Sequence, residues 1–129
     1  MIIELFTLCE GAFNTNGRLT IVNTFENIIS NQYPWRGQLG IALKLLVPKG
    51  EIRDYGFQMR IQNLETKQVF HEINADLKLS QTEDTGDTRI AMATNIQGML
   101  LPSPGEYSVS ISIDCNLIQE FPFKVLKHV

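Results

Sequence analysis

The chain has 129 residues and a mass of 14.6 kDa, which is the usual size of a single domain, so we expect one domain over residues 1–129. Hydrophobic residues make up 43% and charged residues 19% of the sequence, an ordinary globular composition with enough apolar material for a core. The net charge of −3 provides no general attraction to nucleic acid or anionic membranes, so we expect neither as a partner.

Alternation of apolar and polar residues with a period of two recurs along the chain and is typical of strands with one buried face. Helical spacing is nearly absent. The segments with this pattern cover residues 2–13, 18–25, 39–47, 55–62, 69–79, 88–99, 107–113 and 117–126.

Turn residues separate these segments. Asn16-Gly17 suits a tight hairpin turn because both residues tolerate positive φ angles. A second hairpin is expected at 114–116, where Asn116 would take the left-handed conformation. Pro122 cannot donate a ladder hydrogen bond, so the last strand is expected at a sheet edge or at a bulge.

Residues 27–37 have mixed polarity and contain Pro34, and we interpret them as a connection rather than a strand. Within it, Tyr33 and Trp35 are expected to cap one end of the core. The same rings could also stack on a small ligand in a cleft or anchor a protein contact.

Seven to eight strands with turns every ten or so residues predict an all-β fold of two antiparallel sheets, an immunoglobulin-like or C2-like β-sandwich. A closed barrel is the alternative. Gly105 precedes Tyr107 at a Pro-Gly corner, where a tyrosine hydroxyl often binds the backbone as the chain crosses between sheets; an ordinary core tyrosine is the competing interpretation.

The N-terminal segment and the two cysteines indicate a cytoplasmic protein. Residues 1–17 lack a basic start and a small-residue cleavage site, so no secretory signal is expected. No apolar run approaches the roughly 18 residues that a membrane-crossing helix needs. Cys9 and Cys115 are therefore expected as free thiols, with Cys9 buried among apolar neighbours and Cys115 exposed in a turn.

The sequence offers little catalytic chemistry. Of the two histidines, His128 is penultimate and His71 is expected at the margin of the core, and no nucleophile motif surrounds Cys9. Neither zinc-ligand spacing nor a phosphate-binding loop is present. We expect no cofactor and no enzymatic activity.

The carboxylates of Glu83, Asp84 and Asp87 share one loop around Gly86, which could bind calcium. A solvated acidic loop explains them as well, because no second carboxylate cluster accompanies them. The serines of β-strand 107–113 are expected to point to water and could form a flat face that accepts another subunit. The sequence thus favours a non-catalytic protein-interaction or assembly module, with a small-ligand or calcium-binding domain, or an unrecognised enzyme, as alternatives.

Three stretches, FTLCEGAF at 6–13, NGRLTIVNTFENI at 16–28 and LPSPGEYSVSISIDCNLIQEFPFKV at 101–125, resemble a family of short, mainly bacterial proteins known only as a domain of unknown function. The resemblance implies a β-sandwich and no particular activity. The residues that carry it are Leu8, Cys9, Glu10, Gly17, Leu19, Ile21, Phe25, Glu26, Ile28, Pro104, Gly105 and Tyr107.

Overall fold

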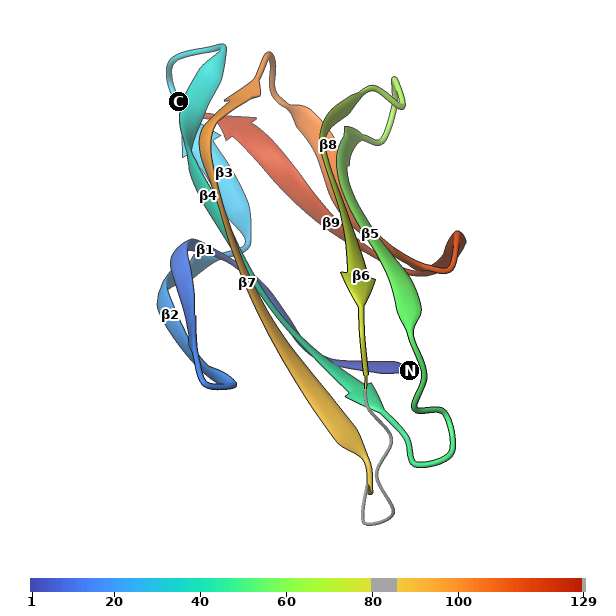
Figure 1. Cartoon of the computed structure of the whole chain (residues 1–129). Helices are drawn as coiled ribbons and strands as arrows, with labels where there is room; N and C mark the ends of the chain where they lie inside the picture. Colours follow the sequence, from blue (N-terminus) through green and yellow to red (C-terminus); the bar gives the residue numbers. More distant parts are fainter. Residues whose placement is uncertain (80–85, 129) are drawn as a thin grey trace. The chain divides into compact units, whose positions relative to one another are not determined.

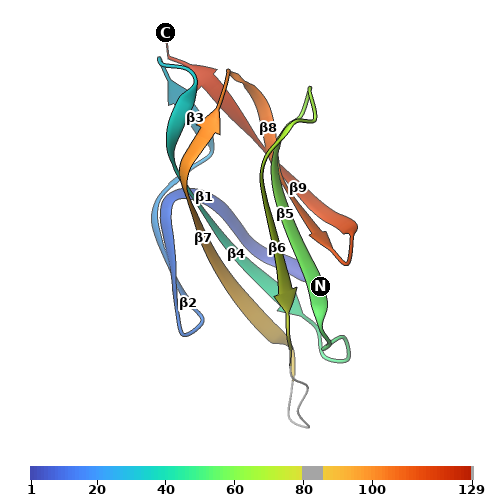
Figure 2. The same ribbon diagram turned by 45° about the horizontal axis from the view of Figure 1, so that its top comes forward.

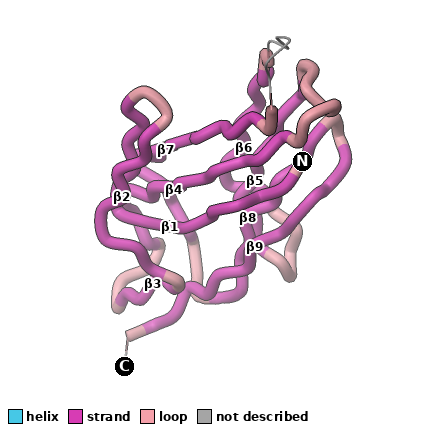
Figure 3. The backbone as a smooth tube through the Cα atoms, turned by 90° about the horizontal axis from the view of Figure 1, so that it is seen from below, coloured by secondary structure: helices cyan, strands magenta, loops and turns pink. Residues whose placement is uncertain are grey.

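The protein was analysed as a computed structural model that describes residues 1–79 and 86–128, and these residues form nine β-strands and no helix (Figures 1 and 3). The strands are β1 (Ile2–Thr15), β2 (Arg18–Phe25), β3 (Asn27–Ser30), β4 (Trp35–Val47), β5 (Tyr55–Asn63), β6 (Val69–Leu77), β7 (Thr88–Leu101), β8 (Gly105–Ile113) and β9 (Asn116–Lys127). The all-β prediction is confirmed.

The strand count exceeds the seven to eight expected, because β3 lies in the segment that was interpreted as a connection. β3 runs parallel to β9, with Ile29 opposite Leu126. A parallel partner far along the chain leaves no turn signal beside the strand, and local patterns therefore could not reveal it.

The described strands form two sheets, which lie in two compact units of the chain. The first unit comprises residues 1–26, 37–53 and 79–98 and holds a four-stranded sheet in the order β2-β1-β4-β7. The second unit comprises residues 27–36, 54–78 and 99 onward and holds a five-stranded sheet in the order β3-β9-β8-β5-β6.

In the four-stranded sheet, β1 and β2 form the hairpin that the Asn16-Gly17 pair predicted (Figure 2). Asn16 has φ 52° and Gly17 has φ 81°, and the Gly17 N–H donates to Oδ1 of Asn14 at 2.9 Å. A turn with two positive φ angles matches the twist of the flanking strands.

Side chains also connect β1 to β7, although β4 separates these strands in the sheet order. Oδ1 of Asn95 accepts the Ala12 N–H at 2.9 Å, and Nδ2 of Asn95 donates to the Ala12 carbonyl at 2.7 Å. Nδ2 of Asn14 donates to the Ala91 carbonyl at 3.0 Å. The pairing of β1 with β4 ends at Cys9, so these side-chain hydrogen bonds from β7 and β1 link the two strands beyond that pairing.

Cys9 is a free thiol with 0% exposure, and it lies directly opposite Gly40 in the β1–β4 pairing. A Cβ atom added at Gly40 would lie 2.9 Å from Sγ of Cys9 and 3.0 Å from the Cys9 carbonyl oxygen. Real Cβ atoms do not approach that closely, so the sheet requires glycine at position 40.

In the five-stranded sheet, β8 is the central strand, and its apolar row is fully buried: Tyr107, Val109 and Ile111 are each 0% exposed. The Tyr107 hydroxyl donates to the Ser103 carbonyl at 2.7 Å. Its ring packs against Phe70 and Phe123, with centroid separations of 5.8 and 5.7 Å. Tyr107 is therefore both a core residue and the donor of a tyrosine-corner hydrogen bond.

β9 is not an edge strand along its whole length, because β8 and β3 flank it. Its pairing with β3 begins only at Lys124, whose N–H donates to Oδ1 of Asn27. N–H direction alternates along a strand, so the Pro122 nitrogen points to the same side as that of Lys124, beyond the end of β3. Pro122 thus occupies a local edge, where no ladder hydrogen bond is lost.

The β8–β9 turn differs from the expected one (Figure 2). Asp114 has φ 50° and Cys115 has φ 68°, and β9 already begins at Asn116. The prediction of a left-handed Asn116 is wrong. Oδ1 of Asp114 accepts the Gly56 N–H at 2.8 Å, which holds the turn against the start of β5.

Candidate functional site

One face of the five-stranded sheet carries Ser108, Ser110 and Ser112 of β8, and we call it the serine face. The expectation that these serines point to water is wrong for two of them: Ser108 is 0% and Ser110 is 8% exposed. Gln62 of β5 and Pro122 of β9 stand directly opposite Ser108 on either side. Short side chains on a central strand lie below the larger ones of the neighbouring strands, so they are covered without leaving this face.

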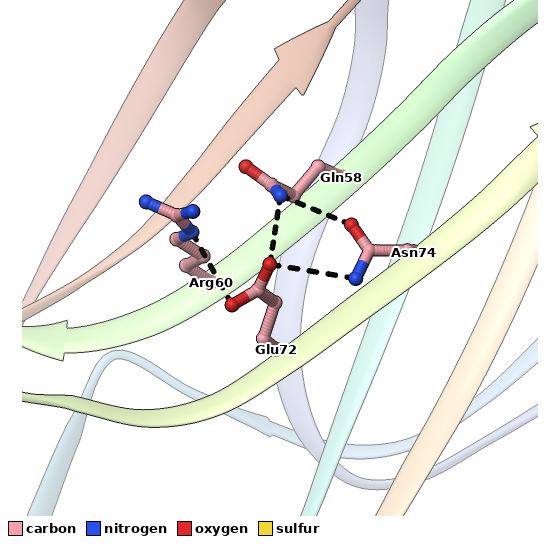
Figure 4. Close-up of polar contacts among 4 residues, drawn as sticks. All are labelled: Gln58, Arg60, Glu72 and Asn74. Carbon is pink, nitrogen blue, oxygen red and sulfur yellow. Dashed lines mark hydrogen bonds and ion pairs between the residues drawn. The ribbon is translucent and has the colours of Figure 1, made fainter. Parts of the chain in front are cut away.

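A cluster of four polar side chains occupies the serine face between β5 and β6 (Figure 4). Gln58 lies opposite Asn74, and Arg60 lies opposite Glu72. Nε2 of Gln58 donates to Oε1 of Glu72 at 2.7 Å and to Oδ1 of Asn74 at 3.0 Å. Nε of Arg60 lies 3.6 Å from Oε2 of Glu72, in an ion pair whose side chains are 44% and 37% exposed.

Glu72 is the central acceptor of this cluster, since Nδ2 of Asn74 also donates to its Oε1, at 3.4 Å. An ion pair as exposed as that of Arg60 and Glu72 contributes less than about 1 kcal/mol to stability. The cluster therefore orders side chains on the surface more than it stabilises the fold.

The Ser108 hydroxyl is buried and makes no hydrogen bond in the part of the chain that the structure describes. An unmade hydrogen bond of a buried polar group costs about 1–3 kcal/mol. Alanine would fit the same space without this cost, so neither packing nor stability explains why position 108 holds a serine.

A pocket of about 440 Å³ adjoins the polar cluster at the end of the same sheet. It is lined by residues 56–58 of β5, residues 74–76 of β6 and the turn residues Asp114 and Cys115. Cys115 is an exposed free thiol. The described lining contains no histidine, lysine or arginine beside the thiol, and more of its surface is apolar than polar, which is typical of a binding groove.

Tyr33 and Trp35 lie in the second unit, where both are half-buried, and neither lines this pocket. The Tyr33 hydroxyl donates to the Leu126 carbonyl at 2.5 Å and so ties the segment after β3 to the end of β9. Burial raises the pKa of the Tyr33 hydroxyl above its usual value. Trp35 is the first residue of β4.

The acidic loop is only partly visible, because Glu83 and Asp84 lie outside the described residues. Oδ1 of Asp87 accepts the Lys49 N–H at 2.9 Å, so this carboxylate holds the turn after β4. In residues 1–79 and 86–128, no three His, Cys, Asp or Glu side chains are grouped closely enough to bind a metal ion.

His71 and Cys9 belong to different units of the chain. In β6, His71 lies opposite Ile61 and Val69 lies opposite Gln62, so Phe70 is an extra, bulged residue. The bulge places Val69 on the opposite face from His71, although strict alternation along β6 would place both on one face. Within the described residues, no helix is long and apolar enough to cross a membrane.

The sequence did not single out the polar cluster or the pocket. Alternation already placed Gln58 and Arg60 on one face of their strand, and Glu72 and Asn74 follow the same period in β6. The missing information was the register between the two strands, which decides that Arg60 meets Glu72.

Comparison with known proteins agrees with the resemblance noted in the sequence but adds no activity. No curated protein matches the chain significantly. Residues 4–126, nearly the whole length, match the model of DUF6941, a family of unknown function. The chain therefore belongs to DUF6941, a family of unknown function.

Proposed function

We propose that the protein is a non-catalytic protein-interaction or assembly module whose two sheets are the layers of an immunoglobulin-like β-sandwich. A row of buried apolar side chains on one face of each sheet supports this architecture, as in Leu43 and Leu45 of β4 and in Val109 and Ile111 of β8. The free thiols of Cys9 and Cys115 support a reducing, cytoplasmic location.

The observation that carries the proposal is a pair of adjoining apolar side chains exposed on the five-stranded sheet. Ile29 is 59% and Leu126 is 39% exposed, and they are directly opposite each other in the β3–β9 pair. Leu117, also on β9, is 59% exposed. Exposed apolar side chains that adjoin one another mark contact surfaces more often than isolated ones do. The net charge of −3 favours a protein over a polyanion as the partner.

The test is affinity purification of the tagged protein from its native cells, followed by reconstitution of each candidate complex from purified components. We expect a purified partner whose binding weakens at least tenfold in Ile29→Lys. Val22→Lys in β2 is the matched control, because Val22 is 41% exposed in the other sheet. Binding that is lost equally in both variants, or no reconstituted complex at all, would contradict the proposal.

The pocket beside Asp114 and Cys115 favours a second candidate, a small-ligand-binding domain. Its volume of about 440 Å³ falls within the range of ligand sites. Native mass spectrometry of protein from native cells tests this candidate, since a bound small molecule would add a fixed mass that Cys115→Trp should abolish.

Calorimetric titration with calcium tests the proposed role of the acidic loop around Asp87.

A further inference from the structure

Three of the four outer strands in the two described sheets carry a feature that hinders pairing with another chain. β2 contains Asn23 with φ 52°, and β7 contains Gly98 with φ 66°, so the backbone of each is interrupted. β3 has only four residues. Irregular or very short edge strands prevent sheets from joining edge to edge.

The fourth outer strand, β6, has no such feature between His71 and Leu77. This stretch contains neither a proline nor a positive φ angle, and its bulge, at Phe70, precedes it. Among the described strands, β6 pairs only with β5. The seven residues from His71 to Leu77 therefore present a regular, unpaired backbone edge.

Side chains along β6 are also incompletely covered. In β5, the row from Tyr55 to Ile61 is buried, with Phe57 2% and Met59 3% exposed. The corresponding residues of β6, Ile73, Ala75 and Leu77, are only half-buried. An additional strand at this edge would cover them.

We propose that β6 pairs antiparallel with β6 of a second copy of this chain, about a two-fold axis at Ala75, so that two five-stranded sheets join into one. The inference goes beyond the proposed function, because its partner is a second copy of the chain and its surface is the β6 edge, not the exposed apolar pair of β3 and β9. Strand addition to an exposed sheet edge is a common mode of protein recognition, and a two-fold pairing uses the same edge of both copies.

Charge excludes three of the alternative registers. Paired residues must lie on the same face, so the axis passes through a residue rather than between two. An axis at Glu72 or at Asp76 would place that carboxylate opposite its own copy, and an axis at Asn74 would place Glu72 opposite Asp76. Like charges directly opposite each other destabilise a strand pair.

An axis at Ala75 brings no like charges together. It places Ile73 opposite Leu77 of the second copy, and Asn74 opposite Asp76. Glu72 comes opposite Lys78, the exposed residue that follows β6. An axis at Ile73 would instead bring the bulge at Phe70 opposite Asp76. The apolar, amide-carboxylate and opposite-charge pairs all favour Ala75.

Charge reversal at exposed positions tests the pairing without disturbing the core. In sedimentation velocity over a concentration series, we expect the wild-type chain to form dimers. Glu72→Lys or Lys78→Glu should each weaken association about tenfold, because two attractive pairs become repulsive, and the double variant should recover it. Lys127→Glu on β9 is the control and should associate like the wild type. A wild-type chain that stays monomeric, or a double variant no better than either single one, would overturn the proposal.

Disulfide formation tests the register in a Cys115→Ser background. Residues directly opposite each other in an antiparallel pair have Cα atoms about 4.5–5.5 Å apart, within reach of a disulfide. Ala75→Cys should therefore form a covalent dimer under mild oxidation, and Asp76→Cys should not. Equal cross-linking at both positions would contradict the axis at Ala75. A monomeric chain that still binds another protein through Ile29 would refute this inference and leave the proposed function intact.

Discussion

The two sheets of this protein differ in the residues that form their hairpin turns, in the exposure of their cysteines and in their outer strands. The four-stranded sheet uses glycine where its hairpin needs positive φ angles, buries its cysteine, and links β1 to β7 through Asn95. The five-stranded sheet forms its tightest hairpin with Asp114 and Cys115, and that cysteine is exposed. Its outer strand β6 has a regular backbone from His71 to Leu77. Side chains of the first sheet thus hydrogen-bond to its own backbone. The second sheet exposes Cys115, Ile29 and the backbone edge of β6, which a partner could contact.

The largest expected effect contrasts the two faces of β8. Ile111→Ala should lower the free energy of unfolding by about 2–4 kcal/mol, because Ile111 is 0% exposed and its removal leaves a cavity. Ser108→Ala, equally buried but without a hydrogen bond, should leave stability unchanged or raise it by about 1 kcal/mol. Urea denaturation measures both. A large loss in Ser108→Ala would mean that its hydroxyl has a partner.

The next largest effect concerns the hydrogen bonds that link β7 to β1 in the four-stranded sheet. Asn95→Ala removes both hydrogen bonds to the backbone of Ala12, and we expect a loss of about 2 kcal/mol. Asn95→Asp keeps an acceptor for the Ala12 N–H, but only its protonated form can donate to the carbonyl, so its loss should be smaller at acidic pH and larger when the carboxylate is ionised. Equal stability of the wild type and Asn95→Ala would show that this link is dispensable.

Opposite substitutions in the two hairpin turns should have opposite signs. Gly17→Ala forces a Cβ atom into the left-handed region, where φ is 81°, and should destabilise by about 1 kcal/mol. Cys115→Gly removes a Cβ atom from a residue with φ 68° and should stabilise by a few tenths to about 1 kcal/mol. Thermal unfolding compares the two, and a stabilising Gly17→Ala would contradict the turn geometry.

The smallest expected effect concerns the two thiols. Burial raises the pKa of Cys9 above 9.0, the ordinary value of a thiol, so its neutral form is favoured in the folded state. This preference leaves the unfolding free energy unchanged at neutral pH and lowers it only as the pH rises above about 9. A thiol reagent at pH 8 should therefore label one cysteine of the native protein, Cys115, and both after denaturation. Fast labelling of Cys9 in the native state would show that the first sheet opens locally.

Much of the strand pattern could be predicted because a period of two is local information. The hairpin at Asn16 and Gly17 followed from the conformational freedom of those two residues. The Tyr107 corner was one of two open interpretations, and the hydrogen bond to Ser103 decides it. A single domain over residues 1–129 stays a prediction.

The features that sequence reasoning missed all depend on residues far apart in the chain. β3 was missed because its partner β9 is distant and parallel. The burial of Ser108 depends on the size of Gln62 and Pro122 across the strands, and no property of β8 itself encodes it.

By itself, the sequence determined most of the strands, the Asn16-Gly17 turn and the apolar face of most strands, because backbone sterics and side-chain alternation act over a few residues. Only the tertiary structure decided strand order and register. Strand order and register depend on which distant segments bury their apolar rows together. They bring Glu72 opposite Arg60 and leave β6 at a sheet edge. The polar cluster and the β6 edge therefore follow from strand order and register, not from local sequence patterns.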